Sequence, residues 1–192
     1  MGTPLVTDKL FKNKDFTVKP LPKADYEECT FKDCKFQTGY LDNQQFVDCT
    51  FIGCDLTNAN IAHTIFNGVH FKACKLLGLQ FNTAAEGLLQ LRFSDCNLTL
   101  AVFYGLNLTK THFQDSNLSQ SDLTEANLTE AIFSNCNLDK AVFERTTLKK
   151  ADLTTAFHFN IDVEKNTLTQ AKFTTEGLSG LLKKYDIVVT KA

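Results

Sequence analysis

The segment from Asn117 to Phe133 reads NLSQSDLTEANLTEAIF, and a large apolar residue stands at every fifth position in it. These residues are Leu118, Leu123, Leu128 and Phe133. An α-helix repeats its faces about every 3.6 residues and a β-strand about every 2 residues. A period of five fits neither element, so this chain must fold in a way that gives five residues a structural meaning.

The same period runs through most of the chain. We call the large apolar residue of each unit its centre, and every centre from Tyr26 to Phe81 and from Phe93 to Leu153 is Phe, Leu, Ile or Tyr. Most units have a small residue two positions before the centre, and many have Asn or Asp directly before it, a residue type that supports turns. Two inward and three outward positions describe one flat side of a solenoid. Four sides make a square coil of about 20 residues, and successive coils stack at about 4.8 Å.

This pattern resembles the pentapeptide-repeat family over residues 26–173. The resemblance implies an all-β fold, a right-handed quadrilateral β-helix whose interior is filled by the centres. Residues 1–24 show no repeat, and their apolar and lysine content predicts an N-terminal cap. We therefore divide the chain into this cap, a β-helix at 25–173 that is interrupted at 82–92, and a C-terminal helix plus strand at 174–192.

The seven cysteines all fall at the small inward position, two residues before a centre. They are Cys29, Cys34, Cys49, Cys54, Cys74, Cys96 and Cys136. Buried thiols behave as small apolar residues, which is the interpretation we favour. A disulfide between adjacent coils is the first alternative, although parallel side chains are poorly angled for one. A metal site is the second alternative, and we expect no cofactor or metal.

The interruption between Phe81 and Phe93 keeps no five-residue register. It predicts either a two-residue bulge that folds back onto the coil or a protruding loop that contacts a partner, because loops carry specificity on rigid scaffolds. The candidate partner-binding residues are Asn82, Thr83, Glu86 and Leu88.

The C-terminal segment has helical periodicity followed by a β-branched run. Thr174 or Thr175 can cap a helix with Glu176 in its first turn, and Ile187 to Val189 predict a strand. Such an appendage resembles the quinolone-resistance (Qnr-type) branch of the family, where it joins two rods into a dimer. The alternative is a monomeric cap on the last coil. The candidate dimer-interface residues are Leu178, Leu181, Leu182, Tyr185, Ile187 and Val188.

Composition and motifs exclude several classes of function. The net charge is −2, so a basic nucleic-acid-binding protein is not expected, and no apolar run is long enough to span a membrane. No catalytic motif such as HExxH or GxSxG occurs, and a solid interior leaves no cleft for a substrate. We therefore expect no enzyme activity. The N-terminus has no secretory signal, and the free thiols fit a reducing compartment, so we expect a cytoplasmic protein.

Two functions fit these observations. The first is a non-catalytic scaffold that presents its rod surface to a macromolecular partner, which the sequence does not identify. The second follows from the Qnr-type resemblance, which implies a mimic of duplex DNA that binds a type II topoisomerase, DNA gyrase or topoisomerase IV. The low net charge favours the first, because duplex DNA carries one charge per about 1.7 Å. A purely structural or self-associating role and metal or redox sensing are weaker alternatives.

Overall fold

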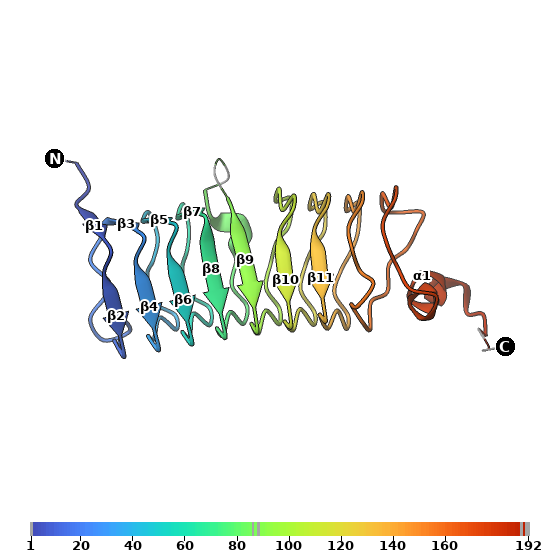
Figure 1. Cartoon of the computed structure of the whole chain (residues 1–192), viewed down its shortest axis with the longest axis horizontal. Coiled ribbons are helices and arrows are strands. Elements are labelled where there is room, and N and C mark those ends of the chain that lie inside the picture. The colour runs from blue at the N-terminus through green and yellow to red at the C-terminus, as the bar shows by residue number, and fades with distance from the viewer. Residues whose placement is uncertain (1, 86, 88, 189, 191–192) are drawn as a thin grey trace.

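The chain forms an elongated rod in which one coil of backbone is repeated along a single axis (Figure 1). The computed structural model describes residues 2–85, 87, 89–188 and 190. β1 and β2 lie at one end of the rod, and the only α-helix among the described residues, α1, lies at the other end. The predicted fold class, a right-handed quadrilateral β-helix, is confirmed.

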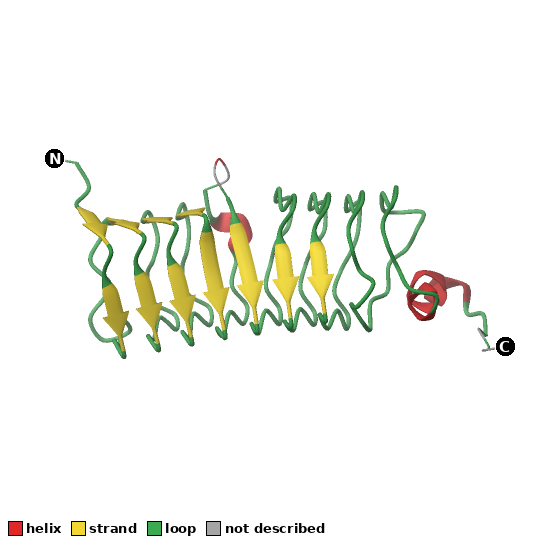
Figure 2. Ribbon diagram, viewed as in Figure 1, coloured by secondary structure: helices red, strands yellow, loops and turns green. Residues whose placement is uncertain are grey.

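The strands are short and form two parallel sheets (Figure 2). The first sheet contains β1 (Leu5–Thr7), β3 (Asp25–Glu27), β5 (Gln45–Val47) and β7 (Ile65–Asn67). The second contains β2 (Leu10–Lys12), β4 (Thr30–Lys32), β6 (Thr50–Ile52), β8 (Val69–Lys72), β9 (Leu91–Ser94), β10 (His112–Gln114) and β11 (Ile132–Ser134). Elsewhere the coils are joined by isolated parallel bridges, such as the one between Val102 and Asp122.

The helical segments are few and short. They are η1 (Phe81–Thr83), η3 (Glu176–Leu178), α1 (Ser179–Leu182) and η4 (Lys183–Tyr185). Within the described part of the chain, none of them is both long enough and apolar enough to cross a membrane.

The turns between sides depend on residues with left-handed backbone. One corner places Asp8, Glu28, Asp48 and Gly68 at φ between 49° and 67° in successive coils. The residues before the centres support these turns, since the Asn97 side-chain carboxamide oxygen accepts a 3.1 Å hydrogen bond from the Thr99 amide. This is the local side-chain role predicted for the Asn and Asp positions.

The centres form continuous stacks along the rod axis. Phe31 pairs with Phe51 in register, with ring centroids 4.7 Å apart, and Phe113 pairs with Phe133 at 4.9 Å. These spacings equal the distance between neighbouring strands, so each ring lies face to face on the ring of the next coil. Along the described coils the interior is therefore filled by stacked side chains.

The seven cysteines are all free and buried at the small inward position, as predicted. Six of the thiols reach back to backbone carbonyls of the preceding coil, for example from Cys49 to Tyr26 at 3.4 Å, and the Cys136 thiol contacts the Ser134 carbonyl at 3.4 Å. Burial raises the pKa of both the Cys49 and the Cys136 thiols to about 12. Thiols in this state are unreactive, which agrees with a packing role.

The expectation that residues 1–24 contain no repeat is wrong. β1 and β2 pair with β3 and β4, so Val6 lies on Tyr26 and Phe11 lies on Phe31. The five-residue period thus begins before Tyr26, and residues 5–21 form a first coil. The small inward positions of this coil hold lysines, which hide the period from a search for small residues.

Gln44 is a polar residue in an apolar position. Its side chain is 3% exposed, and neither polar atom of its carboxamide has a hydrogen-bond partner among the described residues. A buried polar group without a partner costs about 1–3 kcal/mol. We expect Gln44→Met, which keeps the shape, to raise the free energy of unfolding in urea by about 1–2 kcal/mol. A lower stability would instead mean that bound water satisfies the carboxamide.

Candidate functional site

The insertion between Phe81 and Phe93 interrupts the regular wall of the β-helix in the middle of the rod. The ladder runs up to Ala85, whose amide donates to the Thr64 carbonyl at 3.0 Å. It resumes at Gln90, whose amide donates to the Phe66 carbonyl at 2.9 Å. Leu89 packs against the core. The two extra residues are therefore accommodated on one side of one coil, between Ala85 and Gln90.

The four predicted loop residues have different environments. Thr83 is exposed, and its hydroxyl donates to the Gln80 carbonyl at 2.8 Å. Asn82 is only half-buried as a residue, but its side-chain oxygen is fully buried and has no partner among the described residues. Glu86 and Leu88 lie outside the described residues. Their part in partner binding stays a prediction.

A notch lies beside the insertion, at the corner between the two sheets. In the coils before and after it, Gly68 and Lys110 turn this corner with φ of 67° and 60°. The corresponding Gln90 has no left-handed backbone, so the regular turn is missing in this coil. The space between the flanking turns has a volume of about 610 Å³. Its lining includes Asp48, Gly68, His70, Leu89, Gln90, Arg92, Lys110 and His112.

Basic side chains dominate the notch. His70, Arg92 and His112 stand opposite one another on β8, β9 and β10, and their shared outward column forms one wall. Lys110 adds a charge at the rim, where its amine is 3.8 Å from Glu130. Asp48 is the only carboxylate among the described lining residues. The notch therefore suits an anionic group of a partner better than a cationic one.

The sequence analysis missed these three residues because each is outward and unremarkable alone. The available signal is their alignment: His70 and Arg92 align only when the register is shifted by the two inserted residues. Aligning the outward positions of successive coils across the two-residue insertion would identify them.

His70 is neutral at physiological pH. Burial, together with the nearby charges of Lys72 and Arg92, lowers the pKa of its imidazole to about 4. The ring lies 3.0 Å from the Ser94 hydroxyl, which holds it over β9. It can thus form a hydrogen bond with a ligand without adding charge to the notch.

This lowered pKa predicts an acid-dependent loss of stability. The unfolded chain takes up a proton on this imidazole near pH 6.5, whereas the folded chain does so only near pH 4. Stability is therefore complete above pH 6.5 and falls as the pH is lowered toward 4. Because the imidazole is only partly buried, we expect about 1 kcal/mol rather than the full shift. Urea unfolding of His70→Gln at pH 7 and pH 4.5 should lose this part of the pH dependence, and an unchanged slope would contradict the assignment.

The C-terminal appendage is the second candidate surface. A helical segment forms as predicted, and the Thr174 hydroxyl accepts from the Gly177 amide at 3.2 Å. The predicted strand is wrong, because Ile187 and Val188 are irregular, and Val189 lies outside the described residues. No sheet edge among the described residues pairs with this segment, and without a partner strand a β-branched run has nothing to form a ladder with.

The six candidate interface residues divide into two groups. Leu181 packs against the core of the last coil, and Leu182 is half-buried. The other four are exposed by 45–89% of their surface: Leu178, Tyr185, Ile187 and Val188. The appendage therefore covers part of the rod end and leaves an apolar surface on its outer side.

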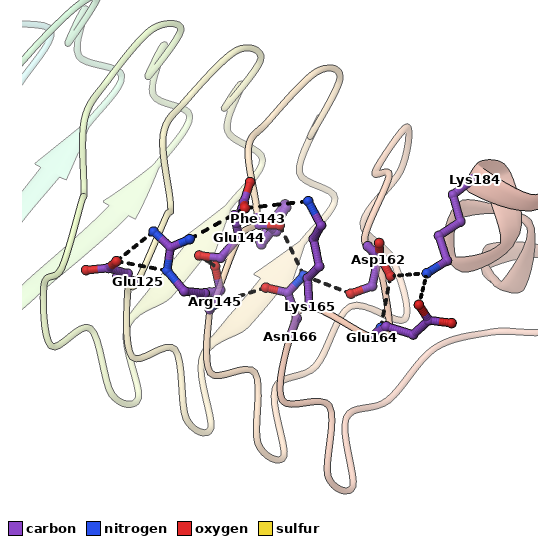
Figure 3. Close-up of polar contacts among 10 residues, drawn as sticks. Glu125, Phe143, Glu144, Arg145, Asp162, Glu164, Lys165, Asn166 and Lys184 are labelled. Carbon is purple, nitrogen blue, oxygen red and sulfur yellow. Dashed lines mark hydrogen bonds and ion pairs between the residues drawn. The ribbon is translucent and has the colours of Figure 1, made fainter.

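Ion pairs orient the appendage on the last coils (Figure 3). The Lys184 amine lies 2.8 Å from Asp162 and 2.7 Å from Glu164, and these contacts raise the pKa of that amine. Along the same side, Arg145 contacts Glu125 at 2.7 Å. Exposed pairs contribute little stability each, so we assign them to positioning the appendage rather than to holding it.

Charge is distributed unevenly between the two sheets. The outward positions of the first three coils on the β1–β3–β5 side form an acidic patch, consisting of Asp8, Asp25, Glu27, Glu28 and Asp48. The outward positions of the second sheet are basic, with Lys12, Lys32, Lys72 and Arg92. At a coil spacing of about 4.8 Å, a surface with the charge density of duplex DNA needs about three negative charges per coil. The acidic patch approaches this density only at one end of the rod.

The described residues contain no group of three His, Cys, Asp or Glu side chains that could hold a metal ion. The seven free cysteines are buried, and none of them lines the notch. The arrangement can bind and orient a partner group.

Comparison with known families identifies the class of protein. A model described as a pentapeptide repeat region matches residues 44–123, and a model of pentapeptide repeats (8 copies) matches residues 121–157. Together they cover more than half of the chain, which belongs to the pentapeptide-repeat family. Neither model describes an enzyme. No curated protein sequence matches the chain.

The fold is similar to that of QnrB1, described as a plasmid-mediated fluoroquinolone resistance protein. A trypsin-treated variant of QnrB1 matches with a TM-score of 0.65 and 18% identity, over 97% of this chain and 100% of that chain. The full-length QnrB1 structure matches with a TM-score of 0.54 and 17% identity, over 95% and 100%. The predicted Qnr-like layout is confirmed, and at this identity the likeness concerns the fold alone.

Proposed function

We propose that this chain is a non-catalytic interaction scaffold whose contact surface is the insertion together with the notch beside it. The observation that carries the proposal is the break in the wall at mid-rod, which gives this region a concave shape and a charge of its own. A rigid solenoid with a packed interior can act only through such outer surfaces. Arg92 and Lys110 at the notch favour a protein partner with an acidic segment.

The test uses three variants of the full chain in pull-downs from the native lysate. The first deletes Glu86 and Gly87, which restores the five-residue register and places Leu88 at the missing centre. The second is Arg92→Gln with Lys110→Gln, which removes the charges and keeps the shape. The matched control is Lys149→Gln with Lys150→Gln, two exposed lysines on a later coil. We expect one partner to be captured by the intact chain and the control and lost from both other variants. Equal capture by all four proteins contradicts the proposed surface.

A second candidate function is mimicry of duplex DNA toward a type II topoisomerase, either DNA gyrase or topoisomerase IV. It is supported by the acidic patch and by the Qnr-like layout of this chain. The fold is similar to that of QnrB1, which is described as a fluoroquinolone resistance protein. The basic outward positions of the second sheet favour the general scaffold instead. A supercoiling assay with gyrase and a fluoroquinolone separates the two functions. If micromolar protein neither inhibits gyrase nor protects it from the fluoroquinolone, the DNA-mimic function is ruled out.

The exposed apolar surface of the appendage supports a homodimer joined through the C-terminal ends of two rods. Leu178, Tyr185 and Ile187 supply its apolar area. Light scattering of the eluted protein at tens of micromolar should give twice the mass of the chain, and Leu178→Ser with Tyr185→Ser should halve it. A monomer mass for the unmodified protein would contradict the homodimer, and the appendage would then serve only as a cap on the last coil.

A further inference from the structure

The small inward positions of the first coil carry the residues least suited to them. In the second coil these positions hold Cys29, Cys34 and Gly39, all buried. Directly beneath, one coil toward the N-terminus, they hold Lys9, Lys14 and Lys19 in the same order, and all three lysines are exposed. The backbone of Lys9 and Lys14 is nevertheless in regular position, because their carbonyls accept from Thr30 and Lys35 at 2.8 and 2.9 Å.

These lysines are compatible only with a coil that has nothing stacked beneath it. In later coils the residue at this position lies against the preceding coil, as where the Cys29 and Cys34 thiols contact the carbonyls of Val6 and Phe11 at 3.4 Å. An ammonium group held there by another coil would be buried without a partner. The lysine side chains of the first coil are instead exposed, which the open end of the rod allows.

The end that they surround is otherwise suited to association. Val6, Phe11 and Phe16 are centres of the first coil, and each is only half-buried, whereas Tyr26, Phe31 and Phe36 above them are no more than 1% exposed. β1 pairs only with β3 and β2 only with β4, so each is an edge strand of its sheet. An apolar surface bordered by edge strands is a template for a second chain.

Proline adds a second protection. All three prolines of the chain lie in the first coil or directly beside it, at Pro4, Pro20 and Pro22. A proline has no amide hydrogen, so it cannot donate to an added strand. Lysine and proline are the residues with which natural sheets protect their edges.

We infer that the N-terminal end of the rod is built to repel a second copy of this chain, and that Lys9, Lys14 and Lys19 are the residues that repel it. Two rods meeting by their N-terminal ends bring two rings of three ammonium groups together around apolar centres. The appendage covers the other end of the rod by packing, whereas this end is kept free by charge. The inference is independent of the proposed partner surface, which lies on the wall of the rod.

Replacing the three lysines by serine tests the inference. Serine fits the small inward position, where Ser116 and Ser121 occupy it in later coils. We expect Lys9→Ser/Lys14→Ser/Lys19→Ser to gain mass with concentration in sedimentation or light scattering, to at least twice the mass of the unmodified protein. The control removes three exposed lysines of the walls, Lys32→Ser/Lys72→Ser/Lys149→Ser, and should keep the unmodified mass. A triple variant that is folded by circular dichroism and keeps the unmodified mass overturns the inference.

A mixing experiment decides the matter if the serine variant does not fold. Lys9→Glu/Lys14→Glu/Lys19→Glu reverses the charge of the ring, so it should not associate with itself. Mixed with the unmodified protein at low salt, it should form a larger species that disperses at about 0.5 M salt, where charges are screened within a few ångströms. Absence of that species at low salt also overturns the inference.

Discussion

Replacing Phe71 by alanine is expected to lower the free energy of unfolding by about 3–5 kcal/mol. The ring is fully buried and lies face to face between Phe51 at 5.1 Å and Phe93 at 5.7 Å. It also meets Phe66 and Phe81 edge-on at 5.9 and 6.2 Å. Its loss interrupts a stack in mid-rod, and the stacked backbones on either side cannot move together to close the cavity. Equilibrium unfolding in urea, followed by far-UV circular dichroism, measures the change.

The matched control is Phe157→Ala, which removes a ring that is 43% exposed on the outer wall. We expect a loss below about 1 kcal/mol there, because the ring lies on the surface and its removal leaves no cavity in the interior. Since each coil contacts only its neighbours, Phe71→Ala can also split the transition into two steps. Equal losses from the two substitutions would show that the interior stack does not hold the rod together.

The interior of this fold can be predicted from the sequence because one rule governs it. A coil has a fixed length, so the large residues at Phe31, Phe51 and Phe71 must align, and the structure pairs them in that register. The small residues follow from the same rule. The rule fails to reveal the first coil because Lys9 and Lys14 occupy small positions, and they can do so only where no coil lies beneath. The lysines that hide the repeat in residues 1–24 are therefore the same residues that mark this coil as the end of the rod.

The outer surface could be predicted only in part. The interruption at 82–92 was found because it breaks the period, but the notch depends on a missing turn at Gln90 and on the alignment of His70 with Arg92. Both features depend on how the backbone accommodates two inserted residues, and the five-residue period does not determine that conformation. The C-terminal strand was wrong for a different reason. The β-branched residues Ile187 and Val188 form a strand only where a neighbouring strand can pair with them. The local sequence does not reveal whether such a strand is present.

Replacing Gly180 by alanine is expected to release the appendage from the last coil. A Cβ atom at Gly180 would lie 2.6 Å from two ring atoms of Phe159 and 2.7 Å from its backbone oxygen. The backbone there is held, because the Ile161 amide donates to the Gly180 carbonyl at 3.0 Å. Alanine favours helix over glycine by about 1 kcal/mol, so any loss must come from this contact. We expect the contact to cost about 2 kcal/mol, as overpacking of a filled site does.

Hydrogen exchange measures that release locally. Amides of residues 176–185 should lose protection in Gly180→Ala, while those of the coils at Phe113 and Phe133 keep theirs. Gly177→Ala is the graded control, because its Cβ would lie 3.2 Å from the tip of the Phe159 ring and at ordinary contact distance, 3.5 Å, from the Thr174 hydroxyl. If the appendage joins two rods, Gly180→Ala should also lower the mass in solution to that of one chain, and Gly177→Ala should not. Unchanged protection in Gly180→Ala would mean that the last coil yields to the helix, so that the appendage is attached by its ion pairs at Lys184 and not by packing.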